Sequence, residues 1–91
     1  MTTDESTKLH RTTYRVLTLL SILSQHEDGL TFTELQRLVD IPKGTLSPML
    51  HTMEHMRFVS CNAITGRYSI GVNTYLAGKV YGRSDVELQF I

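Results

Sequence analysis

Residues 33 to 56 contain two helical patterns with almost no chain between them. The apolar spacing predicts one helix over residues 33–39 and a second over residues 43–56, separated by a tight turn at Asp40 and Ile41. A connection this short makes the two helices neighbours in space. The segment therefore predicts a helix-turn-helix unit, and the rest of the chain is expected to complete the core around it.

One helix is predicted before this unit, and a β-hairpin and another helix after it. Apolar residues recur at helical spacing over residues 14–23, and a very short strand is expected at 30–32. Two runs of β-forming residues flank the turn at 62–66, where Gly66 suits the left-handed position of a hairpin loop. The last predicted helix spans 73–81. The fold class is mainly α with a small β-hairpin, in the order of a winged helix-turn-helix.

Capping signals and apolar faces complete the predicted elements. Thr33 and Gln36 have the spacing of a capping box, which starts the second helix at Thr33, and Gly29 is expected to end the first helix in the left-handed conformation. The residues expected to face the core are Val16, Leu17, Leu19, Leu20 and Leu23 in the first helix, Leu35, Leu38 and Val39 in the second, and Leu46, Met49, Leu50 and Met53 in the third.

The stretch IPKGTLSPML, residues 41–50, places a glycine and a proline inside a helical pattern. Relative to alanine, glycine costs about 1 kcal/mol and proline about 3 kcal/mol in a helix interior. Either the helix begins near Lys43, so that Pro48 has no N–H to donate to the Gly44 carbonyl, or Ser47 caps a helix whose first residue is Pro48. We favour the earlier start, with a distorted first turn.

The charge of the chain gives only mild support to a nucleic-acid partner. The 91 residues include nine basic and nine acidic side chains, but all nine basic ones lie within residues 8–83, where five acids leave a surplus of +4. No apolar run approaches the roughly 20 residues of a membrane span, so no membrane partner is expected. A polar N-terminus without a signal sequence, and the single cysteine Cys61, favour a cytoplasmic protein.

The sequence contains no pattern typical of a catalytic or metal site. His51 and His55 have the spacing of two ligands on one helix face, but no cysteine or carboxylate cluster would complete the site. Cys61 has no basic partner with an orienting acid and is expected to be a small buried residue. Neither a glycine-rich phosphate loop nor a carboxylate pair is present. We therefore expect a binding domain without a cofactor, not an enzyme.

Motifs along the chain carry a family resemblance. A leucine-rich first helix is followed by GLTFTEL at the entry to the second helix, PKGTL at the start of the third and TGRYSIG across the hairpin. Together they resemble the N-terminal DNA-binding domain of the IclR family of bacterial transcription regulators, over about residues 11–81. The resemblance implies a dimeric or tetrameric repressor or activator. Its small-molecule effector would bind to a larger C-terminal domain that this sequence lacks.

This resemblance divides the chain into three parts. Residues 1–10 are a tail, residues 11–82 the winged helix-turn-helix domain, and residues 83–91 the start of a linker helix. Ser84 and Glu87 have the capping-box spacing expected there. The apolar residues that end the sequence suggest that a longer protein was cut at this point.

A winged helix-turn-helix reads base edges with the N-terminal part of its recognition helix and contacts phosphates with basic and hydroxyl side chains. The residues predicted to contact double-stranded DNA are Thr33, Lys43, Gly44, Thr45, Ser47, His51 and Arg67. Lys43 and Thr45 match the family motif, and Lys43 is expected at a phosphate. Arg67 is predicted to enter the minor groove.

Four of these residues also have a purely structural interpretation, which for Thr33 is the cap of the second helix. Thr45 and Ser47 suit a helix N-cap, and Arg67 suits a solvated strand. Two positions depart from the family pattern, because Pro48 stands where a basic residue is frequent and Ile64 stands at the polar wing tip.

Two apolar residues of the first helix lie within its polar stripe. Tyr14 and Ile22 are expected to be covered either by a neighbouring segment or by the second subunit of a homodimer.

Two functions remain open on the sequence alone. The first is sequence-specific binding of double-stranded DNA, as the N-terminal domain of a ligand-responsive regulator. The second is a winged-helix module that binds a protein instead of DNA, which the zero net charge leaves open. A steep loss of DNA affinity with salt would distinguish the first from the second.

Overall fold

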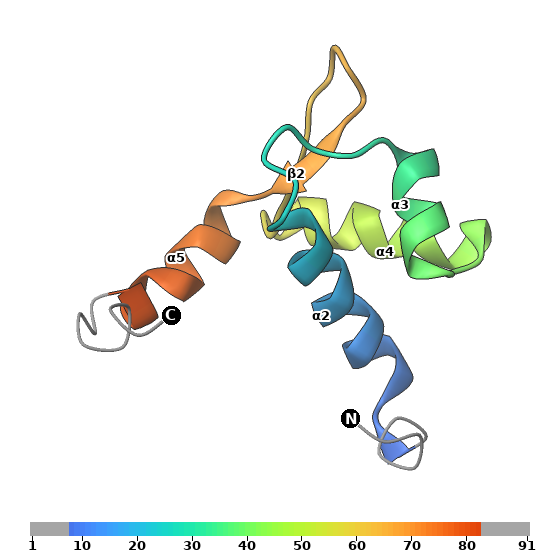
Figure 1. The fold of residues 1–91 in the computed structure, drawn as a ribbon, viewed down its shortest axis with the longest axis horizontal. Helices are drawn as coiled ribbons and strands as arrows, with labels where there is room; N and C mark the ends of the chain where they lie inside the picture. Colours follow the sequence, from blue (N-terminus) through green and yellow to red (C-terminus); the bar gives the residue numbers. More distant parts are fainter. Residues whose placement is uncertain (1–7, 83–91) are drawn as a thin grey trace.

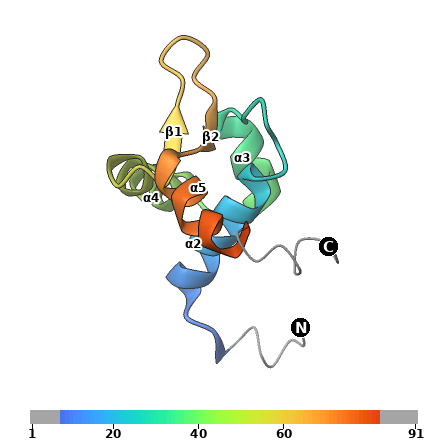
Figure 2. The same cartoon turned by 90° about the vertical axis from the view of Figure 1, so that its left-hand side faces the viewer.

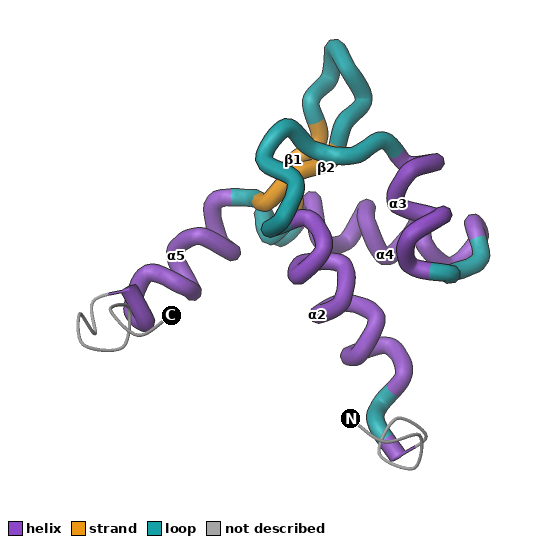
Figure 3. The backbone as a smooth tube through the Cα atoms, in the orientation of Figure 1, coloured by secondary structure: helices purple, strands orange, loops and turns teal. Residues whose placement is uncertain are grey.

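A helix-turn-helix followed by a β-hairpin forms most of the molecule (Figure 1). The computed structural model describes residues 8–82. Its elements are α2 (Arg11–Leu23), α3 (Phe32–Val39), α4 (Lys43–His55), β1 (Val59–Cys61), β2 (Tyr68–Ile70) and α5 (Val72–Gly82), drawn by type in Figure 3. This order confirms the predicted winged helix-turn-helix. The predicted linker helix at 83–91 lies outside the described residues.

The core lies where α2, α3, α4 and β1 meet. Its buried side chains are Leu19, Leu23, Leu30, Leu35, Ile41, Leu46, Leu50, Met53 and Val59. Full burial of such a side chain contributes about 1.5 to 3 kcal/mol, so these residues supply most of the stabilisation. They hold α4 against the rest of the domain by one face only.

Helix α2 begins three residues before the predicted start, because His10 caps it. The His10 side chain accepts a hydrogen bond from the Thr13 N–H at 3.3 Å. The prediction for Leu17 was wrong, since this side chain is 57% exposed. At 100° per residue it lies about 140° from the middle of the buried stripe formed by Leu19 and Leu23, which is too far round the helix to reach the core.

The loop after α2 differs from its prediction at Gly29. The helix ends at Leu23 with Ser24 as its C-cap, so Gly29 is not the capping residue. Gly29 does have a positive φ of 85°, but it turns the chain beside the hairpin. The short strand expected at 30–32 is a single β-bridge, in which Leu30 pairs with Tyr68.

Helix α3 starts at a different capping box from the predicted one. The Thr31 hydroxyl accepts from the Glu34 N–H at 3.2 Å, and the Glu34 carboxylate accepts from the Thr31 N–H at 2.9 Å. The start at Phe32 adds this side chain to the half-buried face of the helix, which a start at Thr33 would not do. Leu38, predicted to face inward, is 54% exposed because it lies at the edge of the apolar stripe.

Helix α4 has the earlier of the two starts considered. It begins at Lys43, follows Pro42 at the N-cap position and continues through Pro48. The carbonyl of Pro42 accepts from the N–H groups of Thr45 and Leu46, at 2.9 and 2.8 Å. The first turn is therefore formed and Ser47 lies inside the helix, so its alternative role as the N-cap is excluded.

Strands β1 and β2 pair antiparallel, with Ser60 opposite Ser69. The connecting loop is organised by Asn62, whose side-chain oxygen accepts from the N–H groups of Ile64 and Thr65 at 2.8 and 3.0 Å. Gly66 has the predicted left-handed conformation, with φ of 73°. The loop projects beyond the helices, as Figure 2 shows, and we call β1, β2 and this loop the wing.

Helix α5 leaves the hairpin through a close backbone crossing. Its start is fixed by side-chain hydrogen bonds to the segment after α4, from Asn73 Nδ2 to the Met56 carbonyl at 2.8 Å and from Thr74 Oγ1 to the Phe58 carbonyl at 2.6 Å. The predicted helix at 73–81 is confirmed to within one residue at each end. Figure 1 shows α5 extending away from α3 and α4.

Candidate nucleic-acid interface

The solvent-facing side of α4 carries several of the residues predicted to contact DNA. Leu46, Leu50 and Met53 face the core, and the opposite side exposes Gly44, Ser47, His51, His55 and Pro48. At 100° per residue, Gly44, Ser47 and His51 lie within about 60° of one another. The fold therefore brings these three predicted residues together on one face.

Thr45 lies apart from that face. Residues two positions apart on a helix differ by about 200° in direction, so Thr45 and Ser47 lie on opposite flanks of α4. Thr45 is half-buried and lines a shallow depression toward α2, together with Thr12 and Val16. A ligand that contacts the exposed face at Ser47 therefore does not contact Thr45 from the same side of α4.

The N-terminus of α4 presents positive charge. Lys43 is its first residue and is exposed, and no acidic residue lies in the first turn. Pro42 provides no side-chain hydrogen bond to the first N–H groups. A helix N-terminus in this state carries a partial positive charge that favours a phosphate, and the Lys43 ammonium adds to it.

Thr33 lies near the N-terminus of α3 and is exposed. The capping hydroxyl belongs to Thr31, so the Thr33 hydroxyl has no part in the capping box. Its predicted structural role was therefore wrong. Its predicted contact with a phosphate does not depend on that role.

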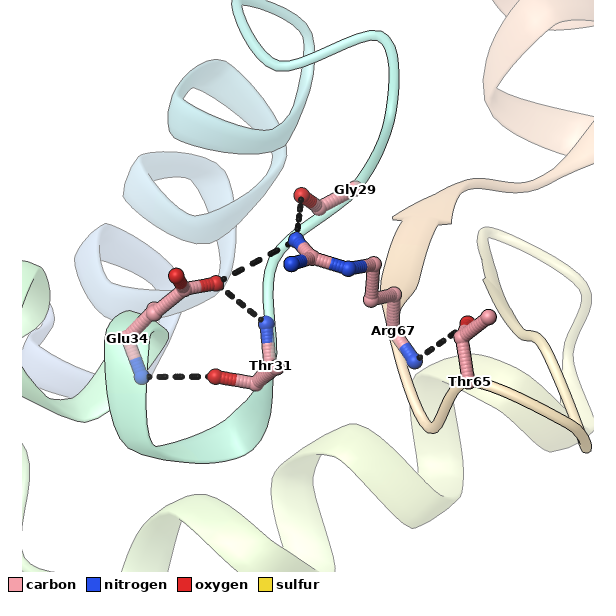
Figure 4. Close-up of polar contacts among 5 residues, drawn as sticks. All are labelled: Gly29, Thr31, Glu34, Thr65 and Arg67. Carbon is pink, nitrogen blue, oxygen red and sulfur yellow. Dashed lines mark hydrogen bonds and ion pairs between the residues drawn. The ribbon is translucent and has the colours of Figure 1, made fainter.

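Arg67, the predicted wing contact, is held by other parts of the protein. Its guanidinium Nη1 donates to the Gly29 carbonyl at 3.1 Å and lies 3.4 Å from the Glu34 carboxylate oxygen (Figure 4). The side chain is 42% exposed. The alternative interpretation of Arg67 as a solvated strand residue is corrected, because Arg67 lies just before β2 and its partly exposed side chain is paired; no local pattern in the sequence predicts its pairing with Glu34.

The charge on Glu34 is stabilised by this arrangement. The hydrogen bond from the Thr31 N–H lowers the pKa of Glu34 below its ordinary value of 4.5, and the nearby Arg67 guanidinium lowers it further, while desolvation acts in the opposite direction. The carboxylate is therefore ionised at neutral pH and offers Arg67 a full negative charge.

The outer face of α2 forms a separate apolar surface. Tyr14 and Ile22 lie there as predicted, Tyr14 exposed and Ile22 half-buried. Leu9 and Leu17, which the sequence did not assign to this surface, line the same shallow depression of about 420 Å³. The repeat of apolar residues at Tyr14 and Leu17 was the available signal, but Leu17 was assigned to the core.

Other types of site have little support in the described part of the chain. Within residues 8–82, no group of three or more His, Cys, Asp or Glu side chains is placed to hold a metal ion. Cys61 is half-buried, with Sγ 4.0 Å from the Asn62 carbonyl. No helix within the same residues has the length and apolar character needed to cross a membrane.

Comparison with known protein families matches residues 12–62 to the IclR helix-turn-helix domain. The match includes α2, α3, α4 and β1, which contribute most of the core and the exposed face of α4. The chain has no match among the curated proteins or the solved structures.

Proposed function

The chain belongs to the IclR helix-turn-helix domain family, and we propose that its α4 reads base edges in the major groove of double-stranded DNA. Membership makes it a DNA-binding domain of a transcription regulator. The observation that supports this role for α4 is its uncapped, basic N-terminus, followed by an exposed face of small and polar residues. Base edges are read by the N-terminal turns of such a helix.

The residues on this face suggest separate roles. Ser47 and His51 carry the donors and acceptors needed at base edges. Gly44 lets the helix backbone approach a phosphate, because no side chain intervenes. Thr45 contacts DNA at the flank facing α2.

Two further groups contribute to binding of the phosphate backbone. Lys43 binds a phosphate beside the N-terminus of α4, and Thr33 does the same beside the N-terminus of α3. The wing approaches the neighbouring groove with its tip, where Ile64 is 95% exposed. Phosphate contacts set the position of the protein, and base contacts set the sequence preference.

The domain acts as a homodimer through the outer face of α2. Tyr14, Leu17 and Ile22 would be covered by the same residues of a second copy, as a two-fold interface requires. Two copies place two recognition helices on one duplex and favour an operator with two half-sites. The regulator that carries this domain responds to a small-molecule effector bound elsewhere in its chain.

Salt-dependent binding by the full-length regulator tests this proposal. A duplex selected from a random-sequence library with the unaltered protein serves as the probe, and its dissociation constant is measured over a range of salt. The logarithm of the association constant, the reciprocal of this dissociation constant, is expected to fall with the logarithm of the salt concentration with a slope of about −0.9 for each phosphate contacted. A winged-helix module that binds protein would select no duplex and show no such dependence.

The Lys43→Ala variant tests the site itself. Loss of one phosphate contact in each protomer is expected to reduce the magnitude of the salt slope by about 1 per protomer, about 2 for the proposed homodimer, and to weaken binding equally across sequences. Lys79→Ala removes the same charge from an exposed position on α5 and serves as the matched control. If Lys43→Ala and Lys79→Ala give the same slope, Lys43 does not contact a phosphate.

A further inference from the structure

We propose that Arg67 is a positioning residue that fixes the wing to the start of α3 and thereby sets the angle at which the wing meets DNA. We call Gly29, Thr31, Glu34 and Arg67 the wing clamp (Figure 4). The inference rests on the proposed function, because it assigns the wing and the helix-turn-helix to one duplex. It replaces the sequence-based expectation that Arg67 enters the minor groove.

The clamp joins segments that are far apart in the sequence. Arg67, which immediately precedes β2, reaches the Gly29 carbonyl 38 residues earlier and the Glu34 carboxylate 33 residues earlier. One guanidinium nitrogen therefore contacts both the loop before α3 and its first turn. Within residues 8–82 this is the only ion pair, and it lies where the wing meets the helix-turn-helix.

Both acceptors are themselves fixed in place. Glu34 is held because its carboxylate oxygen also accepts from the Thr31 N–H at 2.9 Å, as half of the capping box. The Gly29 carbonyl belongs to a backbone with positive φ, followed at once by the Leu30–Tyr68 bridge. Arg67 therefore binds acceptors that are already ordered, so its contacts require no further ordering of Gly29 or Glu34.

Gly29 allows the close approach that the clamp requires. A Cβ atom at this position would lie 2.8 Å from the Tyr68 carbonyl oxygen and 3.2 Å from Arg67 Cβ. The two backbones are joined here by the hydrogen bonds between Leu30 and Tyr68, at 2.8 and 2.7 Å. Val59 anchors the wing in the core, and the Arg67 contacts add an attachment beside the Leu30–Tyr68 bridge, on the side of the wing that faces α3.

Whether Glu34→Gln raises or lowers the DNA affinity distinguishes a clamp role for Arg67 from a direct contact with DNA. Replacement by glutamine keeps the capping box, since its amide oxygen can accept from Thr31, but removes the charge that holds Arg67. If Arg67 contacts DNA, removal of this competing carboxylate releases the guanidinium and strengthens binding. If Arg67 is the clamp, the same change loosens the wing and weakens binding.

The experiment measures the affinity of full-length Glu34→Gln, Arg67→Ala and the double variant for the selected duplex. We expect each single variant to bind about threefold to fivefold more weakly. The double variant should lose no more than Arg67→Ala alone, since both changes break one unit. The salt slope should stay unchanged, and Glu27→Gln, which removes an exposed loop charge, should have no effect.

Arg67→Lys gives the conservative comparison. A single ammonium lacks the planar fork of arginine, so we expect partial recovery relative to Arg67→Ala. Stronger binding by Glu34→Gln, a salt slope smaller by about 1 per protomer in Arg67→Ala, or unchanged affinity in both variants would each overturn the clamp.

Amide hydrogen exchange in the absence of DNA tests the clamp independently of DNA binding. Amide hydrogen exchange at Leu30 and Tyr68 should become faster in Arg67→Ala while the core amides of α2 keep their protection, which also shows that the variant is folded. Unchanged exchange at this bridge would overturn the clamp. If the unaltered protein selects no duplex, the proposed function fails, and the exchange result still decides whether the clamp exists.

Discussion

Gly44 and Gly71 differ in whether the folded chain leaves room for a side chain. A Cβ on Gly71 would overlap the Arg57 carbonyl and lie 2.8 Å from the Phe58 carbonyl carbon, where the hairpin crosses the end of α4. A Cβ on Gly44 would have no neighbour within 4 Å. Gly71 is therefore required by the fold, whereas packing within the described residues does not require a glycine at position 44.

Alanine at the two glycines should change stability in opposite directions. Gly71→Ala is expected to destabilise the protein by about 1 to 3 kcal/mol, because the contacting atoms are backbone and cannot move away cheaply. Gly44→Ala should stabilise it by about 0.5 to 1 kcal/mol, since glycine is unfavourable within a helix. Urea unfolding of both variants measures the difference.

The same Gly44 variant tests the proposed approach of α4 to a phosphate. A methyl group at this position should weaken DNA binding about tenfold, or about 1.4 kcal/mol, while the fold becomes more stable. Unchanged affinity would show that the DNA backbone does not come close to Gly44.

At the level of elements, α4 combines a strong apolar stripe with an internal proline. Pro48 is exposed, and it lacks the N–H that would otherwise donate to the Gly44 carbonyl. The helix nevertheless continues to His55, because Leu46, Leu50 and Met53 are buried on its inner face. Tertiary packing thus outweighs the local preference of one residue.

Pro48→Ala should restore the missing hydrogen bond and raise stability. The expected gain is about 1 to 3 kcal/mol, with the upper value being the full cost of proline in a helix interior. Pro42→Ala is the matched control, because position 42 precedes the helix and no helical hydrogen bond is gained there. A lower unfolding midpoint for Pro48→Ala would mean that ring packing at this position outweighs the hydrogen bond.

The elements were more predictable from the sequence than their exact ends and faces. Apolar periodicity located every described helix and the hairpin, because burial of one face is what makes each element stable. Two threonines with an acceptor three residues later, Thr31 and Thr33, made the start of α3 ambiguous. Leu17 and Leu38 lie at the margins of apolar stripes, where only the neighbouring elements decide which side is covered.

The candidate site was also predicted only in part. The face of α4 followed from its periodicity, but the pairing of Arg67 with Glu34 depends on a tertiary contact across 33 residues. No local pattern around Arg67 indicates that partner. Long-range polar contacts of this kind are therefore the part of the site that sequence reasoning missed.

At the scale of the whole molecule, the outer face of α2 should control assembly. Tyr14→Glu together with Ile22→Glu is expected to place four like charges across the two-fold interface and shift the protein toward monomer. Sedimentation velocity of the full-length protein over a range of concentrations measures the change. Thr18→Glu adds a single charge per protomer at the same depression and should weaken the dimer less. If all three substitutions leave the dimer unchanged, the interface lies elsewhere.

The wing divides into a fixed base and an open tip, and this division affects how such a domain changes its target during evolution. The base is held by Arg67 and by the Leu30–Tyr68 bridge, whereas Ile64 at the tip is almost fully exposed. Substitutions or insertions at an exposed loop tip cost little stability. A lineage could therefore alter the contacts that we propose between the wing and a DNA groove, one residue at a time, without first having to repair the fold.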